Sequence, residues 1–237
     1  DYTEIRLEFT EATHVGFRGR LLETANRSVD QGGIVRSLVR NGGWGVCTFN
    51  SLDRLEQRVE TAYQCARLVQ GERITLAEVP PARDEIRVPL KTDFRNVPLS
   101  EKKDLAQAYN DILLSQPRIV DTQVSYSDYW TIAVYANSDG AWILEERPMA
   151  AVHLMATARQ GSDVQQLADG VSSPGGYETV LGHEEMARGL ARRAADLLEA
   201  QPVAGGVYPV VCDPELAGVF AHEAFGHLSE ADFVYAN

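Results

Sequence analysis

Two histidines flank a glutamate near the end of the chain, in the run His222-Glu223-Ala224-Phe225-Gly226-His227. These residue types can build a hydrolytic zinc site. Neutral imidazoles hold the ion, an open coordination position keeps a water, and a carboxylate that is not a ligand accepts the proton of that water. The pattern therefore predicts His222 and His227 as metal ligands and Glu223 as the general base.

The spacing of the two histidines constrains the helix that carries them. At 100° per residue, side chains five positions apart are offset by about 140°, too far to share one ion on a straight α-helix. The helix must therefore distort. Gly226 directly precedes His227, and glycine is the residue type that allows a break, a π-bulge or a left-handed exit.

A plainer interpretation stays open for the same residues. His222 and His227 could be ordinary, partly buried imidazoles, with Glu223 on a solvated helix face. If they do bind a metal, Glu230 and Asp232 are the only other acidic side chains close by in sequence, and the chain after Gly226 would have to fold back for either to reach it.

The remaining histidines are weaker candidates. His183-Glu184 also begins with the His-Glu pair, but Ala187 and Arg188 stand where a second ligand should be, so we interpret it as a helix start with an acidic first turn. His14 and His153 lie in strand-like stretches without partners in sequence, which favours a structural role.

The helix that carries the motif is expected to begin at residues 213–215. Asp213 is a good N-cap, Pro214 suits the first helical position, and Glu215 lies near the positive helix end. A short strand is expected over residues 207–212, after a break rich in Pro and Gly at residues 201–206.

Farther upstream, the first 50 residues alternate like a meander of hairpins, and Ser51 is expected to cap a helix that ends at Gly71. Residues 77–98 contain several prolines and are interpreted as a connection. Ser100 then opens a second helix, and the alternating strands that follow are joined by a turn at residues 137–140.

Residues 161–178 are rich in Gly, Ser and Asp, and residues 172–176 within this stretch are interpreted as a loop, before a helix over about residues 184–200. Together these features predict an α+β fold in which antiparallel sheets pack with helices. We expect an N-terminal domain over residues 1–201, with modules at about 1–76 and 99–201. Residues 202–237 would begin a catalytic domain.

Composition excludes several classes of protein. The chain has 237 residues, 44% hydrophobic and 24% charged, with a net charge of -12. This charge disfavours nucleic-acid binding, and the apolar stretches are too short to cross a membrane. Three cysteines are too few for a disulfide framework, and no secretory signal is visible, so a cytoplasmic location is expected.

The sequence resembles the TldD/PmbA family of zinc metallopeptidases. The resemblance is carried by the His222–His227 element, by residues 204–211 before it, and by Glu230-Ala231-Asp232 after it. It extends back through Asp30-Gln31-Gly32-Gly33, Gly42-Gly43-Trp44-Gly45 and the turn at 137–140. Because the TldD type carries the motif and the PmbA (TldE) type lacks it, this chain resembles the TldD type.

That resemblance implies a cytosolic zinc peptidase that cleaves small or unfolded peptides, working with a TldE/PmbA-type partner subunit or as a homodimer. His222 and His227 would bind Zn²⁺, and Glu223 would be the general base. In the family a third ligand, a cysteine, comes from a long C-terminal domain. The sequence ends at Asn237, so we expect a truncated chain that is inactive alone.

Two other functions stay open. Some family members are named as modulators of DNA gyrase, so a protein-binding regulatory module is one alternative. The other is a family member that hydrolyses an amide in a biosynthetic intermediate. The intact metal motif favours hydrolysis, but the residues do not identify the substrate.

Overall fold

A computed structural model describes residues 1–40, 42–69 and 74–232. The chain divides into two compact units, Asp1–Ala200 and Gln201–Asn237, called unit 1 and unit 2 below. No helix among the described residues is long and apolar enough to cross a membrane.

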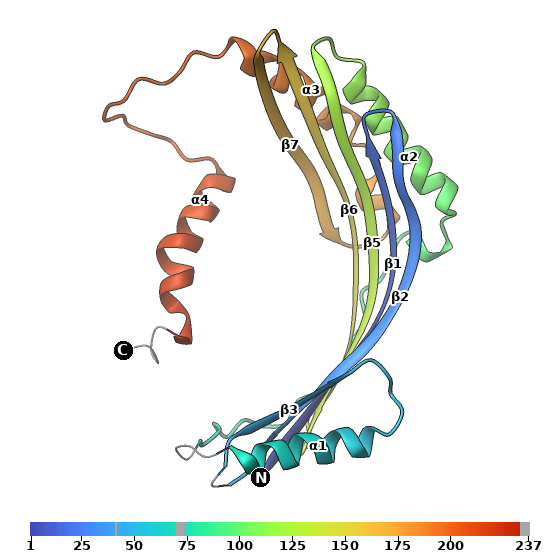
Figure 1. The fold of residues 1–237 in the computed structure, drawn as a ribbon, viewed down its shortest axis with the longest axis vertical. Helices are drawn as coiled ribbons and strands as arrows, with labels where there is room; N and C mark the ends of the chain where they lie inside the picture. The colour runs from blue at the N-terminus through green and yellow to red at the C-terminus, as the bar shows by residue number, and fades with distance from the viewer. Residues whose placement is uncertain (41, 70–73, 233–237) are drawn as a thin grey trace. The chain divides into compact units, whose positions relative to one another are not determined.

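Unit 1 is built on one seven-stranded sheet with the order β3-β2-β1-β5-β6-β4, in which β7 also pairs with β6 (Figure 1). All pairs are antiparallel except β4 with β6. The strands are β1 (Tyr2–Arg18), β2 (Leu21–Leu38), β3 (Trp44–Phe49), β4 (Arg83–Ile86), β5 (Ile119–Asn137), β6 (Trp142–Gln160) and β7 (Asp163–Pro174). The predicted α+β class is therefore confirmed.

The two modules expected from the sequence share this single sheet. Strand β1 from the first pairs with β5 from the second, from Glu4 opposite Asn137 to Arg18 opposite Gln123. The predicted turn between β5 and β6 is present, with Gly140 at a φ of 97°. The limits of the domains, and the start of a catalytic domain at residue 202, stay a prediction.

Several predicted elements were wrong. The stretch rich in Gly, Ser and Asp, for which no strand was expected, contains β7, and the last residues of β7 overlap the loop expected at 172–176. Pairing with the long β6 supplies the hydrogen bonds of this strand, and its composition alone does not indicate them. Gly170 in β7 does not form a turn. It allows β7 to lie close to the His153 side chain of β6, since a Cβ at this position would come 2.9 Å from His153 Nδ1. The expected connection at 77–98 contains β4, and residues 207–212 form no strand.

The first helix, α1 (Leu55–Leu68), begins later than expected. Ser51 does not cap it. Its hydroxyl instead donates to an Asp53 carboxylate oxygen and accepts from the Asp53 backbone N–H. The predicted end at Gly71 lies outside the described residues. Helix α1 packs against β2 and β3, where Val35, Phe49 and Ala62 form a small core.

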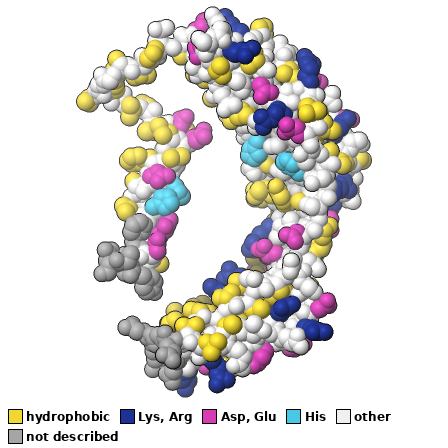
Figure 2. Space-filling model, in the orientation of Figure 1, with side chains coloured by type: hydrophobic (Ala, Val, Ile, Leu, Met, Phe, Trp, Pro, Cys, Tyr) yellow, Lys and Arg dark blue, Asp and Glu magenta, His cyan; other side chains and the backbone are white. Residues whose placement is uncertain are grey.

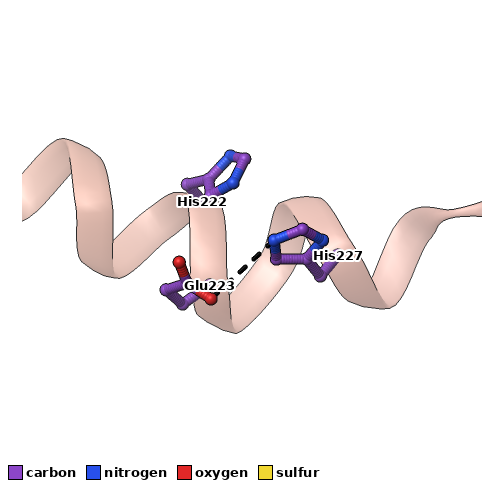
Figure 3. Close-up of side chains that lie close together, drawn as sticks. All are labelled: His222, Glu223 and His227. Atoms are coloured by element: carbon purple, nitrogen blue, oxygen red, sulfur yellow. Dashed lines mark ion pairs between the residues drawn. The ribbon is translucent and has the colours of Figure 1, made fainter.

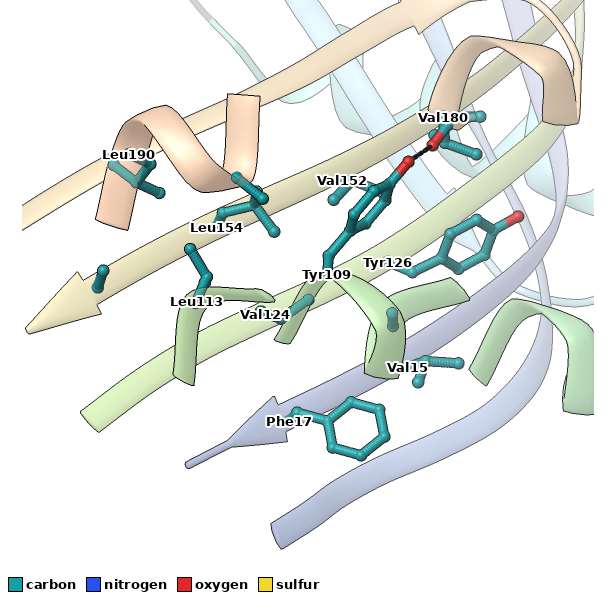
Figure 4. Close-up of a cluster of buried hydrophobic side chains, with 14 of the residues drawn as sticks. Val15, Phe17, Tyr109, Leu113, Val124, Tyr126, Val152, Leu154, Val180 and Leu190 are labelled. Carbon is teal, nitrogen blue, oxygen red and sulfur yellow. Dashed lines mark hydrogen bonds between the residues drawn. The ribbon is translucent and has the colours of Figure 1, made fainter. Parts of the chain in front are cut away.

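Two further helices, α2 (Leu99–Leu114) and α3 (Glu184–Asp196), contact each other and cover one face of the sheet. The main core lies between them and the strands (Figure 4). The Tyr109 hydroxyl donates to the Val180 carbonyl at 2.7 Å and accepts from the His183 N–H at 3.2 Å. The predicted helix start at His183-Glu184 is thus confirmed, with Glu184 in the first turn.

A charged pair is buried at one end of this core. Lys102 on α2 and Asp128 on β5 are almost fully buried, with Lys102 Nζ 2.5 Å from Asp128 Oδ2. Lys102 also donates to the Thr13 hydroxyl, and the Tyr126 hydroxyl donates to Asp128. Burial lowers the pKa of Lys102, and the contact with Asp128 opposes that shift only in part. These contacts connect α2 to β5 and β1, and each charge of the pair compensates the burial of the other.

Candidate metal centre

The candidate site lies in unit 2, on α4 (Pro214–Ala221) and the turns that continue it. Asp213 caps α4 as predicted: its Oδ1 accepts from the Leu216 N–H at 2.8 Å, and Pro214 occupies the first turn. Local residues therefore determine where this helix begins, without any tertiary contact.

The helix widens at the motif. Residues His222–Gly226 form a π-helical turn, closed by a hydrogen bond from the His227 N–H to the His222 carbonyl. A bond over five residues returns His227 to the side of the helix that carries His222. The two ring centroids are 4.5 Å apart at an interplanar angle of 70°. The predicted distortion is confirmed.

Of the three distortions expected near Gly226, the structure shows the π-helical one. The Gly226 φ of -58° and ψ of -56° are ordinary right-handed helical values, so no left-handed exit occurs. A Cβ at this position would lie 3.6 Å from His222 Nδ1, an ordinary contact. The distortion therefore resides in the hydrogen-bond pattern of the turn and does not require the conformational freedom of glycine.

The three motif side chains converge (Figure 3). One donor atom each from His222, Glu223 and His227 can be chosen so that all lie within 4.8 Å of one another, and Glu223 Oε2 is 3.8 Å from His227 Nε2. Imidazole nitrogen and carboxylate oxygen are donors that Zn²⁺ accepts in proteins. The residues present therefore fit a zinc ion, with two imidazoles beside one carboxylate.

The site is open to solvent in unit 2. The Glu223 and His227 side chains are 65% and 46% exposed. No described residue of unit 2 is buried, and Figure 2 shows hydrophobic, acidic and histidine side chains together on its surface. Within this unit, the motif side chains are therefore accessible to water.

One contact was not anticipated from the sequence. Glu230 Oε1 lies 2.7 Å from His227 Nδ1, on the opposite side of the ring from the nitrogen that faces Glu223. The backbone N–H of Glu230 donates to the His227 carbonyl and closes a 3-10 turn over His227–Ser229. The spacing of three residues was the available signal, because side chains i and i+3 meet on a helix.

The other histidines lie apart from this cluster. His183 Nε2 is 3.0 Å from the Thr179 carbonyl oxygen. His14 on β1 and His153 on β6 line a cavity of about 530 Å³ that also contains Ser125. Within the described ranges, neither belongs to a group of residues placed to hold a metal. Among the candidates in the described ranges, the structure thus brings His222, Glu223 and His227 together, and it places Glu230 against His227.

Comparison with known proteins places the chain in a class. The PmbA/TldA metallopeptidase domain 1 model matches residues 3–66, and the PmbA/TldA metallopeptidase central domain model matches residues 92–201. A metalloprotease of Synechocystis sp. is 38% identical over 100% of this chain and 51% of that protein. A zinc metalloprotease TldD homolog of Saccharolobus solfataricus is 26% identical over 87% of this chain and 45% of that protein.

Solved structures share the fold. A proposed modulator of a DNA gyrase from Thermotoga maritima has a TM-score of 0.71 and 17% identity, over 86% of this chain and 46% of that one. TldE from Thermococcus kodakarensis has a TM-score of 0.61 and 16% identity, over 84% of this chain and 44% of that one. At these identities the likeness describes the fold alone.

The class is therefore an α+β protein assembled from metallopeptidase-family domains. Since the two models match most of the chain in consecutive order, the chain belongs to the TldD/PmbA family. It spans about half the length of the curated relatives it matches. The two model matches end at residue 201, so the roles of His222, Glu223 and His227 stay a prediction.

Proposed function

We propose that this chain contributes the metal-binding helix of a zinc-dependent peptidase that hydrolyses peptide or amide bonds in small or unfolded peptides. The convergence of His222, Glu223 and His227 on a π-helical turn is the observation that carries the proposal. The metalloprotease names of the relatives support the same reaction class.

His222 and His227 would hold the ion, each through one imidazole nitrogen. When bound, zinc polarises the scissile carbonyl and lowers the pKa of a bound water to about 7. Glu223 would take the proton of that water and return it to the leaving amine. Its carboxylate is 65% exposed and lies beside the His227 nitrogen, so a water at the ion is within its reach.

The ligand set needs a further member, because catalytic zinc sites use three protein ligands. We propose that a cysteine from a C-terminal catalytic domain supplies it, and that the 237-residue chain alone is inactive and retains zinc weakly. Metal analysis of the dialysed chain tests this. Stoichiometric zinc together with peptidase activity would mean that the third ligand is already present.

Partner and location are also proposals. A TldE-type subunit or a second copy would complete the assembly, a suggestion supported by the structural likeness to TldE. A cytoplasmic location follows only from the sequence features. The gyrase-modulator alternative is supported only by the names of structural neighbours from Thermotoga maritima and Bacteroides thetaiotaomicron, whereas a donor set that fits zinc favours hydrolysis.

The experiment is Glu223→Gln in the full-length protein, assayed on an unstructured peptide with zinc content measured in parallel. We expect hydrolysis to fall by about 10²–10⁴-fold with zinc retained, because the carboxylate acts on water and not on the metal. Glu215→Gln, an exposed position in the first turn of α4, is the control. Zinc lost together with activity would make Glu223 a ligand, and unchanged activity would reject the mechanism.

A further inference from the structure

The chemistry of the contact between His227 and Glu230 determines which of the two side chains donates the hydrogen bond. An ionised carboxylate can only accept hydrogen bonds, so a neutral imidazole must donate to it from the nitrogen it touches. Glu230 Oε1 is 2.7 Å from Nδ1. The proton of neutral His227 therefore belongs on Nδ1, and the lone pair belongs on Nε2.

The surroundings of the other ring nitrogen, Nε2, indicate what this tautomer could do. Nε2 faces Glu223, whose Oε2 is 3.8 Å away, too far for a hydrogen bond. The ring of His222 lies beside it. With the proton on Nδ1, the lone pair of Nε2 is directed to the same side as the Glu223 carboxylate, an arrangement that a cation would satisfy.

We propose that Glu230 is a positioning residue that holds His227 in the Nδ1–H tautomer and presents Nε2 as the metal-binding nitrogen. The inference rests on the proposed function, because it assigns a task within the same site. It also separates Glu230 from the ligands: its oxygen occupies the nitrogen that the metal does not use. Carboxylates that hydrogen-bond ligand histidines in this way raise ligand basicity and fix ring orientation.

The side chain and the backbone of Glu230 have separable effects. The backbone N–H closes the turn onto the His227 carbonyl, and Ser229 Oγ donates to the Phe225 carbonyl at 2.8 Å. Removing the Glu230 carboxylate leaves both of these contacts in place. A substitution to alanine can therefore test the carboxylate without dismantling the turn.

The test is nitrogen NMR of the imidazoles in the metal-free chain, at about pH 8.5, where a free imidazole is neutral. We expect wild-type His227 to be mainly the Nδ1–H tautomer. Glu230→Ala should return it to the Nε2–H form that free histidine prefers, whereas Glu230→Gln, which keeps an accepting oxygen, should retain part of the Nδ1–H population. Glu215→Ala on the same helix is the control and should change nothing.

Backbone amide shifts of Leu228 and Ser229 report whether the turn survives in each variant. A wild-type His227 in the Nε2–H form, or a tautomer that Glu230→Ala leaves unchanged, would overturn the proposal. Because no metal is present, this result is independent of peptidase activity. If Glu223→Gln contradicted the proposed function while His227 remained Nδ1–H, the positioning contact would stand without its catalytic purpose.

Discussion

Unit 1 and unit 2 are organised by different kinds of contact. In unit 1, residues far apart in sequence meet: β1 pairs with β5, and Lys102 meets Asp128 beneath helix α2. In unit 2, the contacts that form the candidate site join residues at most five positions apart, from the Asp213 cap to the His227–Glu230 hydrogen bond. Unit 1 has a buried core, and the described part of unit 2 has none.

The residues expected to stabilise the fold and the residues of the candidate metal site therefore lie in different units. The side chains with metal-binding chemistry are held by helix-local hydrogen bonds on an exposed segment, while the large buried clusters lie in a unit without a metal cluster in its described residues. Substitutions in unit 1 should therefore lower the free energy of unfolding more than the matched substitutions in unit 2. Four such pairs test the comparison.

The largest effect is expected at the buried ion pair. Asp128→Ala leaves the Lys102 ammonium buried without its counter-charge, which should lower the free energy of unfolding by about 3–5 kcal/mol. Asp213→Ala in unit 2 removes an exposed cap and should cost about 1 kcal/mol. Urea denaturation measures both. The double variant Lys102→Met/Asp128→Leu should recover much of the loss, and an Asp128→Ala cost below that of Asp213→Ala would contradict the assignment.

The second pair compares two leucines. Leu190 on α3 is fully buried and Leu216 on α4 is 56% exposed. Leu190→Ala should destabilise by about 2–5 kcal/mol through lost burial and a cavity, whereas Leu216→Ala should stay within about 0.5 kcal/mol. Urea midpoints followed by circular dichroism measure the difference. Equal losses would mean that Leu216 is packed in solution.

Two glycines form the third pair. A Cβ on Gly45 of β3 would lie 2.0 Å from the Ala62 carbonyl oxygen and 2.3 Å from Ala66 N, both backbone atoms of α1. Gly45→Ala must displace that helix and should cost about 1–3 kcal/mol. Gly226→Ala meets no such obstacle and should be neutral or stabilising by up to about 1 kcal/mol. Thermal unfolding compares them, and a larger cost at Gly226 would show that the π-helical turn does need glycine.

The smallest effect concerns acid stability. Burial raises the pKa of Glu4, but hydrogen bonds from Tyr2 and Arg36 outweigh it and hold the pKa below its ordinary 4.5. A lowered carboxyl pKa contributes stability above the unfolded pKa, and this is lost as pH falls through the folded pKa. Glu4→Gln should cost about 1 kcal/mol at pH 7 and flatten the acid limb below about pH 4.5.

Unfolding free energies measured across pH 3 to 7 check this expectation. Glu215→Gln in unit 2 is the matched control and should keep the wild-type slope, since Glu215 lies in the exposed first turn of α4. An acid limb in Glu4→Gln as steep as in the wild type would mean that other carboxylates carry the pH dependence.

Much of the fold was predictable where patterns were periodic or local. The α+β class, the turn at 137–140 and the start of α3 at His183-Glu184 all followed from alternation, helical spacing and capping residues. Strand β7 did not, because its Gly- and Ser-rich sequence becomes a strand only through pairing with β6. Cross-strand pairing is a property of two segments, and no single-segment pattern contains it.

By itself, the sequence determined the distortion at the candidate site. His222 and His227 are five positions apart, a spacing at which they cannot share one ion on a straight α-helix, and the structure forms a π-helical turn there. Only the tertiary structure decided that two modules share one sheet, that Gly45 makes room for α1, and that Lys102 meets Asp128. The physical reason is range: backbone geometry acts over a single helical turn, whereas burial acts between distant segments.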